Sequence, residues 1–145
     1  MYKNYYTGNI TPEEGTIFVF GSNPRGIHGA GSAKVAREHF GAIYGVGEGR
    51  QGQGNSYALP TTNLGVDCKR HGLMPPDEIV GHIKKLYQYA EQNPELKFKI
   101  AYRNQPNEVT LCGYSGGDLQ KMFKAAGPIP DNIYFSEEWA NSGIL

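Results

Sequence analysis

The chain has 145 residues, of which 39% are hydrophobic and 19% are charged, a composition typical of a globular protein and not of a disordered one. This length is ordinary for one domain with its own hydrophobic core, so we expect a single domain over residues 1–145. The 14 basic and 14 acidic residues give a formal net charge of zero. That balance argues against nonspecific binding to nucleic acid or to an anionic membrane surface.

The sequence contains no apolar stretch near the roughly eighteen residues that a membrane-spanning helix needs, and its first residues lack the apolar segment of a secretory signal. We therefore expect a cytoplasmic protein that does not insert into membranes, and we expect a monomer. Cys68 and Cys112 could pair in principle, but thiols in a chain without an export signal are more often reduced. We expect no disulfide.

The first predicted element is a buried strand at residues 16–23, TIFVFGSN, an apolar and β-branched run that ends in small polar residues. A helix is predicted from Gly31 because apolar residues recur at helical spacing, with Ser32 able to cap it and Gly41 suited to end it. Residues 45–56 hold five glycines and predict a loop. A short strand, YALPT, then ends near Pro60.

The second half predicts a long helix from PPDE onward, with one apolar face. That face consists of Ile79, Ile83, Leu86, Tyr87 and Ala90. The alternation of residues predicts strands at 97–103 and 108–112, with a turn at QPN between them. DLQKMFKAAG predicts a helix with Asp118 near its start, and DNIYFSEEW predicts a last strand.

Strands that alternate with helices indicate a three-layer α/β domain. Ligands of such sheets bind beyond the carboxyl ends of the strands. The two glycine-containing turns, at residues 23–31 and 113–117, both follow predicted strands. We therefore expect them on the same side of the sheet.

The glycines of the first turn could let backbone N–H groups approach phosphate oxygens, and the helix that follows adds its positive amino-terminal dipole. A glycine-rich turn that only lets the helix pack against the strand explains the pattern equally well. A triphosphate P-loop is excluded because GxxxxGK[ST] is absent, and a dinucleotide Rossmann site lacks its acidic residue. Cys68 and His71 form only half of a zinc site, so we expect no metal.

The order of motifs resembles that of the macro domain family of ADP-ribose-binding modules. GNIT at residues 8–11, the strand IFVF, Asn23, HGAG at residues 28–31 and a helix follow one another as in that family. YALPT and the later VTLCGYSGG are similar to its middle strand and its second phosphate loop. The resemblance covers most of the chain. It implies a macro-domain-like α/β/α fold with a mixed central sheet, an ADP-ribose-type ligand and no cofactor.

The resemblance also assigns residues. Asn9 matches an aspartate that contacts adenine in the family. An amide lacks the charge that strengthens a hydrogen bond to the adenine amino group. Asn9 could equally be a turn or helix-cap residue. Asn23 matches the asparagine on the distal ribose, and Tyr114 and Ser115 depart from the family's G-x-G-x-A-G loop. The implied ligand-binding residues are Asn9, Ile10, Gly21, Ser22, Gly29, Ala30, Gly31, Gly113, Tyr114, Ser115 and Gly116.

Asn23 and His28 are the implied catalytic residues, which would position the distal ribose and water. Hydrolysis of ADP-ribosyl linkages on a protein partner, or of ADP-ribose 1″-phosphate, is the activity that the resemblance implies. A module that only binds ADP-ribose, or that sequesters a nucleotide messenger, is the alternative, and His28 could simply be a polar loop residue. Glu48 and Arg50 could reach a ligand if their loop were a lid, although a solvated loop is favoured. Tyr114 and Phe135 could stack on a base or pack in the core.

Overall fold

The computed structural model describes residues 1–26, 31–50, 54–63 and 73–145. Of the residues singled out above, His28, Gly29, Ala30, Cys68 and His71 lie outside the described residues. The described residues form six strands and four helices. The strands are β1 (Tyr5–Tyr6), β2 (Thr16–Ser22), β3 (Gly49–Arg50), β4 (Ser56–Pro60), β5 (Lys97–Ile100) and β6 (Ile133–Ser136). The helices are α1 (Gly31–His39), α2 (Pro76–Gln92), α3 (Gly116–Ala125) and α4 (Glu137–Ala140).

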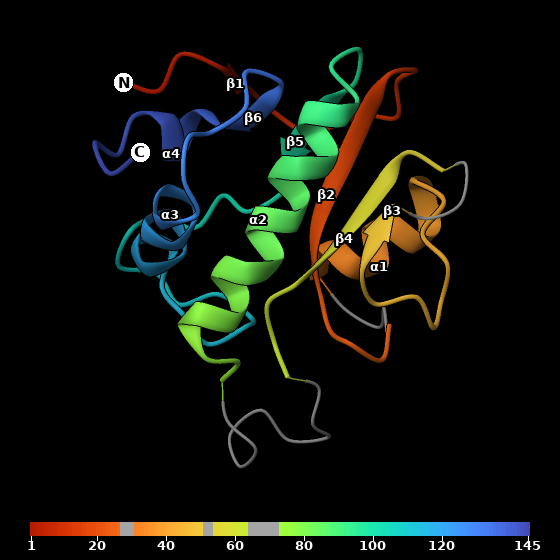
Figure 1. Ribbon diagram of the computed structural model, residues 1–145, viewed down its shortest axis with the longest axis horizontal. Coiled ribbons are helices and arrows are strands. Elements are labelled where there is room, and N and C mark those ends of the chain that lie inside the picture. Colours follow the sequence, from red (N-terminus) through yellow and green to blue (C-terminus); the bar gives the residue numbers. More distant parts are fainter. Residues whose placement is uncertain (27–30, 51–53, 64–72) are drawn as a thin grey trace.

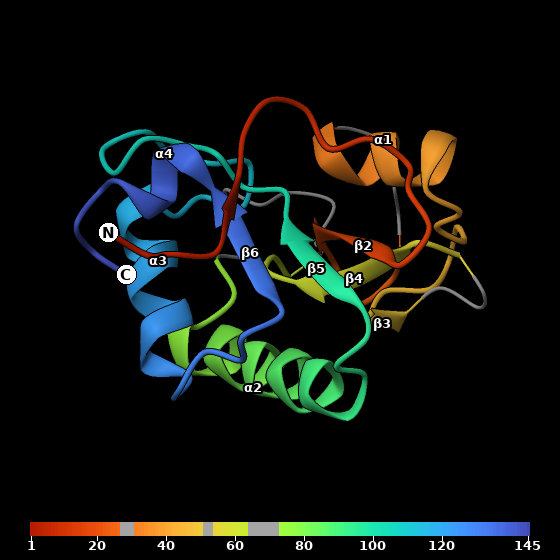
Figure 2. The same cartoon turned by 90° about the horizontal axis from the view of Figure 1, so that it is seen from above.

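The strands form one sheet in the order β1-β6-β5-β2-β4-β3. Neighbouring strands are parallel except β3 and β4, which are antiparallel, so the sheet is mixed. Figure 1 shows the long helix α2 crossing in front of the sheet. In Figure 2, α2 lies below the strands, α3 lies to their left and runs down toward α2, and α1 lies above the strands. The predicted three-layer α/β/α fold with a mixed central sheet is confirmed.

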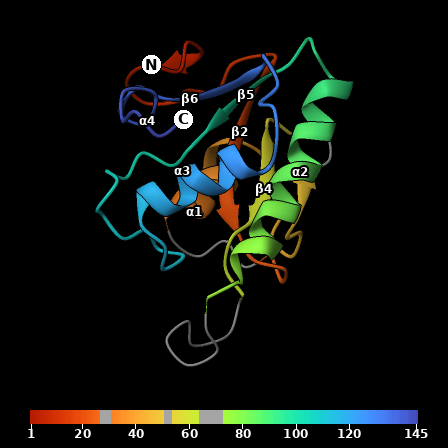
Figure 3. The same ribbon diagram turned by 60° about the vertical axis from the view of Figure 1, so that its left-hand side comes forward.

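Two apolar clusters hold the layers together. The larger one joins the sheet to α2 and α3, which lie side by side in Figure 3. The smaller one joins Phe18 and Phe20 of β2 to Ala33 and Ala36 of α1. Burial of these apolar side chains is the main favourable contribution to the stability of such a domain.

The predicted strand at residues 16–23 is confirmed as β2, whose side chains are nearly all buried because it pairs with β4 on one side and β5 on the other. The predicted apolar face of the long helix is confirmed as well. All five of its residues are buried in α2. This helix starts with Pro76 and carries Asp77 and Glu78 in its first turn, where acidic side chains interact favourably with the helix dipole.

The strand predicted at residues 108–112 is wrong. Its backbone hydrogen bonds are local, from Thr110 N to Tyr114 O and from Gly113 N to Thr110 O, and a single antiparallel bridge joins Val109 to Ser115. The strand predicted at 97–103 is also shorter, because β5 ends at Ile100. An alternating sequence can therefore form a folded-back loop when no neighbouring strand is available to pair with it.

The glycine-rich loop contains the short strand β3, which the sequence did not predict. A Cβ on Gly26 would lie 2.3 Å from the backbone of Gly45, and a Cβ on Gly47 would lie 2.2 Å from Asn23 O. Both glycines therefore let this loop pack closely against the turn after β2. Glu48 contacts His82 and Lys85 of α2, so its carboxylate is directed at that helix.

Two further elements differ from expectation. The first strand, β1, pairs with β6, whereas the sequence analysis assigned no strand there. The end of the last predicted strand folds instead as α4, whose cap is Ser136, with Oγ accepting a hydrogen bond from Trp139 N. In the part of the chain that the structure describes, no helix is both long and apolar enough to cross a membrane.

Candidate functional site

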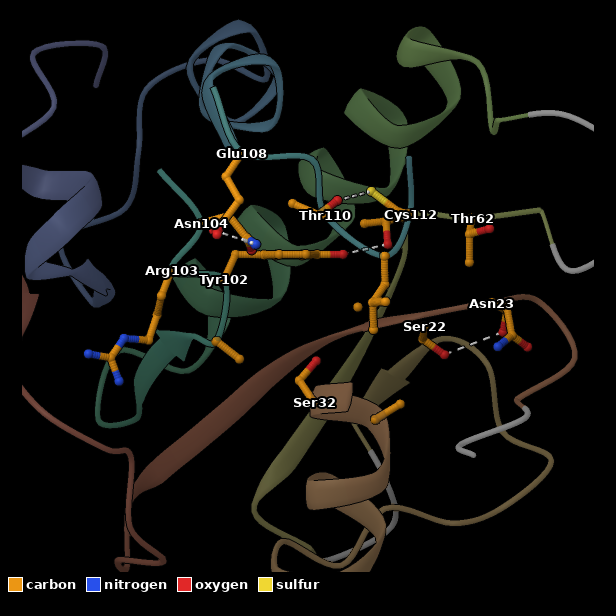
Figure 4. A pocket seen from close by; sticks show the side chains of 15 residues that line it. Ser22, Asn23, Ser32, Thr62, Tyr102, Arg103, Asn104, Glu108, Thr110 and Cys112 are labelled. Carbon is orange, nitrogen blue, oxygen red and sulfur yellow. Dashed lines mark hydrogen bonds between the residues drawn. The ribbon is translucent and has the colours of Figure 1, made fainter. Parts of the chain in front are cut away.

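A cavity of about 600 Å³ opens at the carboxyl ends of β2, β4 and β5. This size is within the range of small-molecule sites, and the position is the one at which open parallel sheets bind ligands. The amino terminus of α1 and the loop at residues 108–112 complete its wall (Figure 4). The lining residues are Gly21, Ser22, Asn23, Ser32, Ala33, Thr61, Thr62, Ala101, Tyr102, Arg103, Asn104, Glu108, Thr110, Leu111 and Cys112.

Tyr102 occupies the middle of this cavity wall. Its hydroxyl shares a hydrogen bond of 2.7 Å with Thr61 Oγ1, and its ring stacks on Trp139 with 5.9 Å between ring centroids and an angle of 2°. A Cβ on Gly21 would lie 2.2 Å from the Tyr102 hydroxyl oxygen. Gly21 therefore makes room for Tyr102. Burial raises the pKa of Tyr102 well above its ordinary value, so its hydroxyl is neutral and can donate.

Asn104 and Glu108 hold the start of the loop that follows β5. Asn104 Nδ2 donates to Glu108 Oε1 over 2.9 Å, and Trp139 Nε1 donates to Asn104 O over 2.7 Å. Both side chains are directed at each other in Figure 4. The Glu108 carboxylate is thus partly satisfied by an amide within the protein.

The end of this loop carries a buried thiol. Cys112 Sγ lies 2.9 Å from Thr110 Oγ1, which also donates to Tyr114 O over 2.8 Å. Leu111 is 79% exposed, yet a Cβ on Gly31 would lie 2.6 Å from its Cδ1 atom. Leu111 therefore reaches across to the first residue of α1, and the two sides of the cavity approach each other there.

Arg103 is the cationic side chain in the cavity lining. Its guanidinium donates to Glu138 Oε1 over 2.8 Å, to Gly8 O over 3.1 Å and to Asn9 Oδ1 over 3.5 Å. The hydrogen bond from Arg103 lowers the pKa of the Glu138 carboxyl, and the same bond raises the pKa of the guanidinium. Arg103, which follows β5, thereby connects this segment to two others through hydrogen bonds: the chain before β2 and the helix α4.

The amino terminus of α1 supplies polar backbone to the cavity. Ser32 and Ala33, in the first turn, line it, and this turn contains no acidic residue. The first N–H groups of a helix have no partner within the helix and carry a partial positive charge. A phosphate group at this end would therefore receive hydrogen bonds without needing a neighbouring cation.

The structure places only some of the predicted site residues at the cavity. Gly21, Ser22 and Asn23 line the cavity, and Gly31, the first residue of α1, lies beside Leu111 of the lining. Asn9 reaches it through Arg103, whereas Ile10 packs against the apolar cluster under α1. Asn23 is 6% exposed, and its carbonyl accepts a hydrogen bond from Gly26 N.

The four residues predicted from the second phosphate loop are not part of the cavity lining. Ser115 caps α3, since its Oγ accepts a hydrogen bond from Asp118 N over 3.1 Å. Tyr114 packs against the larger apolar cluster and donates to Met74 O. A Cβ on Gly113 would lie 2.1 Å from Leu73, and one on Gly116 would lie 2.2 Å from Asn104 O. Phe135, the other stacking candidate, is fully buried in the core.

Several lining residues were missed by sequence reasoning, namely Thr61, Thr62, Tyr102, Arg103, Asn104 and Glu108. The first four follow β4 or β5 in the structure, but the predicted strands covered Thr61, Tyr102 and Arg103. Only Thr62 and Asn104 came after a predicted strand and carried a usable signal. The carboxyl ends of parallel strands meet at one edge, so the residues after every predicted strand are site candidates. Glu108 carried no such signal, since it lay in a wrongly predicted strand.

The described residues contain no group of three or more His, Cys, Asp or Glu side chains that could hold a metal ion. No protein-family model, curated protein or solved structure matches the chain. The site must therefore be interpreted from its own geometry and from the motif order of the sequence.

Proposed function

We propose that the cavity at the carboxyl ends of β2, β4 and β5 binds a nucleotide of the ADP-ribose type. The observation that carries this proposal is the amino terminus of α1, which opens onto the cavity with Ser32 and Ala33 and without an acidic side chain. A diphosphate is the ligand group that such a helix end favours. Threonine, serine and asparagine side chains around it supply hydrogen bonds for ribose hydroxyl groups.

An orientation for the ligand follows from the two ends of the cavity. In Figure 4, Arg103 lies on one side, Asn23 lies on the other, and Ser32 lies between them in that view. The resemblance to macro domains assigns the base to Asn9, which contacts Arg103, and the distal ribose to Asn23. A bound ADP-ribose would then extend from Arg103 to Asn23, with its diphosphate beside α1.

Binding without turnover is the use of the site that the described side chains support best. Among the described lining residues, Glu108 accepts a hydrogen bond from Asn104, Cys112 is paired with Thr110, and no histidine lies beside a nucleophilic side chain. Hydrolysis of ADP-ribosyl linkages or of ADP-ribose 1″-phosphate is the alternative. It would depend on Asn23 together with His28, which lies outside the described residues.

Calorimetric titration with ADP-ribose, AMP and NAD tests the proposal, and a turnover assay on ADP-ribosylated protein and on ADP-ribose 1″-phosphate separates its two forms. The decisive variant is Ser32→Glu, which places a negative charge where the diphosphate would lie. Acidic residues in the first turn favour a helix, so the protein should still fold. We expect at least tenfold weaker binding of ADP-ribose.

Ser32→Gln is the matched control, because it has the same size as the Glu variant but no charge. It should bind ADP-ribose more tightly than Ser32→Glu does. Asn23→Ala should also weaken binding. If the wild-type protein does not bind ADP-ribose, or if Ser32→Glu binds it as the wild type does, the proposed function is wrong.

A further inference from the structure

Part of one sheet face is left uncovered by α1. The helix packs on Phe18 of β2, and the strand register pairs Phe18 with Lys99 of β5 and Lys99 with Tyr134 of β6. Side chains paired in this way point to the same face of a sheet. Lys99 and Tyr134 therefore continue the face that α1 covers, toward β6, and Lys97 joins them because it lies two residues before Lys99. Figure 2 shows β5 and β6 between α1 and α4 on this side.

A hollow of about 520 Å³ lies on this uncovered face, and we call it the tyrosine–lysine groove. Its lining residues are Tyr5, Tyr6, Thr7, Glu13, Thr16, Lys97, Lys99 and Tyr134. It shares no lining residue with the cavity at the carboxyl ends of the strands. The groove is thus a separate feature of the molecule and does not depend on the function proposed above.

Each lysine of the groove is held beside an aromatic ring. Lys97 Nζ lies 5.8 Å from the centroid of the Tyr134 ring, and Lys99 Nζ lies 5.9 Å from that of Tyr6. The Tyr6 ring is itself fixed, because its hydroxyl donates to Ile100 O over 2.6 Å. Within the described residues, neither ammonium group forms an ion pair with a carboxylate. Cation–π contacts of this kind contribute only about 0.5–1 kcal/mol at exposed sites, so they leave the ammonium groups able to bind an anion.

The chemistry of the lining selects for a phosphate group next to a planar ring. Alternate residues of a strand lie about 7 Å apart, so Lys97 and Lys99 can both reach one phosphate. Tyr134 is half-buried, which leaves ring surface on which a base can stack, whereas Tyr5 pairs with the buried Phe135 and so points to the opposite face. Glu13 is the acidic residue of the lining, so two ammonium groups face one carboxylate. That balance favours a single phosphate over a polyphosphate.

We propose that the tyrosine–lysine groove is a second ligand site, which binds a nucleotide through one phosphate at Lys97 and Lys99 and through its base on the Tyr134 ring. The nucleotide can be free in solution or can be one unit of a single-stranded nucleic acid, because the phosphate and the base are the same in both. The balanced charge of the whole chain does not oppose this site, since the positive charge is local.

The test is a titration of the ¹⁵N-labelled full chain with AMP, followed by two-dimensional NMR. We expect shifts of the amide signals of β5 and β6 around Lys99 and Tyr134, whatever happens at the amino terminus of α1. The double variant Lys97→Gln, Lys99→Gln should bind AMP in the groove at least tenfold more weakly. The double variant Lys121→Gln, Lys124→Gln makes the same charge change at exposed positions of α3 and should bind as the wild type does.

Two further ligands define the chemical class and the source of the nucleotide. Inorganic phosphate should bind the groove at least tenfold more weakly than AMP, because it lacks the base. A thymidine hexanucleotide that binds the groove at least tenfold more tightly than AMP would identify a nucleic-acid strand as the source, and weaker or equal binding would identify a free nucleotide.

The proposal is overturned if millimolar AMP shifts no signal of the groove, if the Lys97 and Lys99 variant binds as the wild type does, or if phosphate alone binds as well as AMP. Because the groove and the cavity give separate signals, loss of one site is distinguishable from loss of the other.

Discussion

The Tyr102 hydroxyl group occupies the space that a Cβ on Gly21 would need, with 2.2 Å between the two positions. Gly21 lies in β2 without a positive φ angle, so its backbone would accept an alanine, and the cost of a substitution comes from the contact alone. Gly21→Ala should lower the free energy of unfolding by about 1–3 kcal/mol, as expected for overpacking of a filled site. Urea unfolding measures this loss.

Gly81→Ala is the control for that experiment. Gly81 lies within α2, and a Cβ there would meet no atom within 4 Å. Alanine is favoured over glycine inside a helix, so this variant should be more stable by about 0.5–1 kcal/mol. A Gly21→Ala protein as stable as the wild type would show that Tyr102 moves aside freely.

Ser115 should be a stability residue and not a ligand contact. Ser115→Ala removes the side chain that accepts a hydrogen bond from Asp118 N at the start of α3, and loss of such a cap costs about 0.5–2 kcal/mol. Thermal unfolding should show the loss, and calorimetry should show unchanged nucleotide affinity. Ser115→Asp keeps the capping oxygen and should restore stability. A Ser115→Ala protein of normal stability and reduced affinity would instead make Ser115 part of the binding site.

The protein should be less stable when Asn132 loses its side-chain amide nitrogen. Asn132 Nδ2 lies within hydrogen-bond distance of the carbonyl oxygens of Ala90, Asn93 and Leu96, which connect the end of α2 to the start of β5. Asn132→Ala should destabilise the protein by about 1–3 kcal/mol, since these partly buried acceptors lose their donor. Asn132→Asp should cost at least as much, because a carboxylate would face carbonyl oxygens. Asn107→Ala, at an exposed position, should leave the urea midpoint unchanged.

The Arg103–Glu138 pair should make stability depend on acidic pH. The pKa of Glu138 is lower in the folded protein than its ordinary value of 4.5, so the stabilisation is complete above that value and is lost as the pH falls through the lowered pKa. Glu138→Gln removes the titrating carboxyl. The melting temperature of the wild type should exceed that of the variant at pH 7, and the difference should shrink below about pH 4.5. A difference that stays constant down to pH 3 would contradict the role of this pair.

The pattern of apolar residues correctly predicted those strands and helices whose apolar side chains are the ones buried in the fold. β2 is flanked by strands on both sides and is apolar from Ile17 to Phe20, and α2 has one apolar face because one side of it packs on the sheet. The loop at residues 108–112 alternates like a strand, but its Thr110 bonds back to Tyr114. Pairing partners are a property of the tertiary structure, so alternation alone could not exclude this loop.

The part of the candidate site at the end of β2 was predictable, because β2 is the strand that the sequence indicates most clearly. Ser22 and Asn23 come directly after the apolar run of β2, and both line the cavity. Tyr102 was missed because the predicted strand at 97–103 extended over it, whereas β5 ends two residues earlier. The contact between Arg103 and Asn9 joins residues 94 positions apart, and no spacing along the chain reveals such a contact.

The two outermost strands of the sheet, β1 and β3, have only two residues each. An edge strand offers unpaired N–H and C=O groups to other chains, and a short edge offers few of them. The longer, more apolar strand β2 is kept at the centre of the sheet, where both of its edges are occupied. This order of strands leaves few unpaired backbone groups at the edges of the sheet for pairing with another chain.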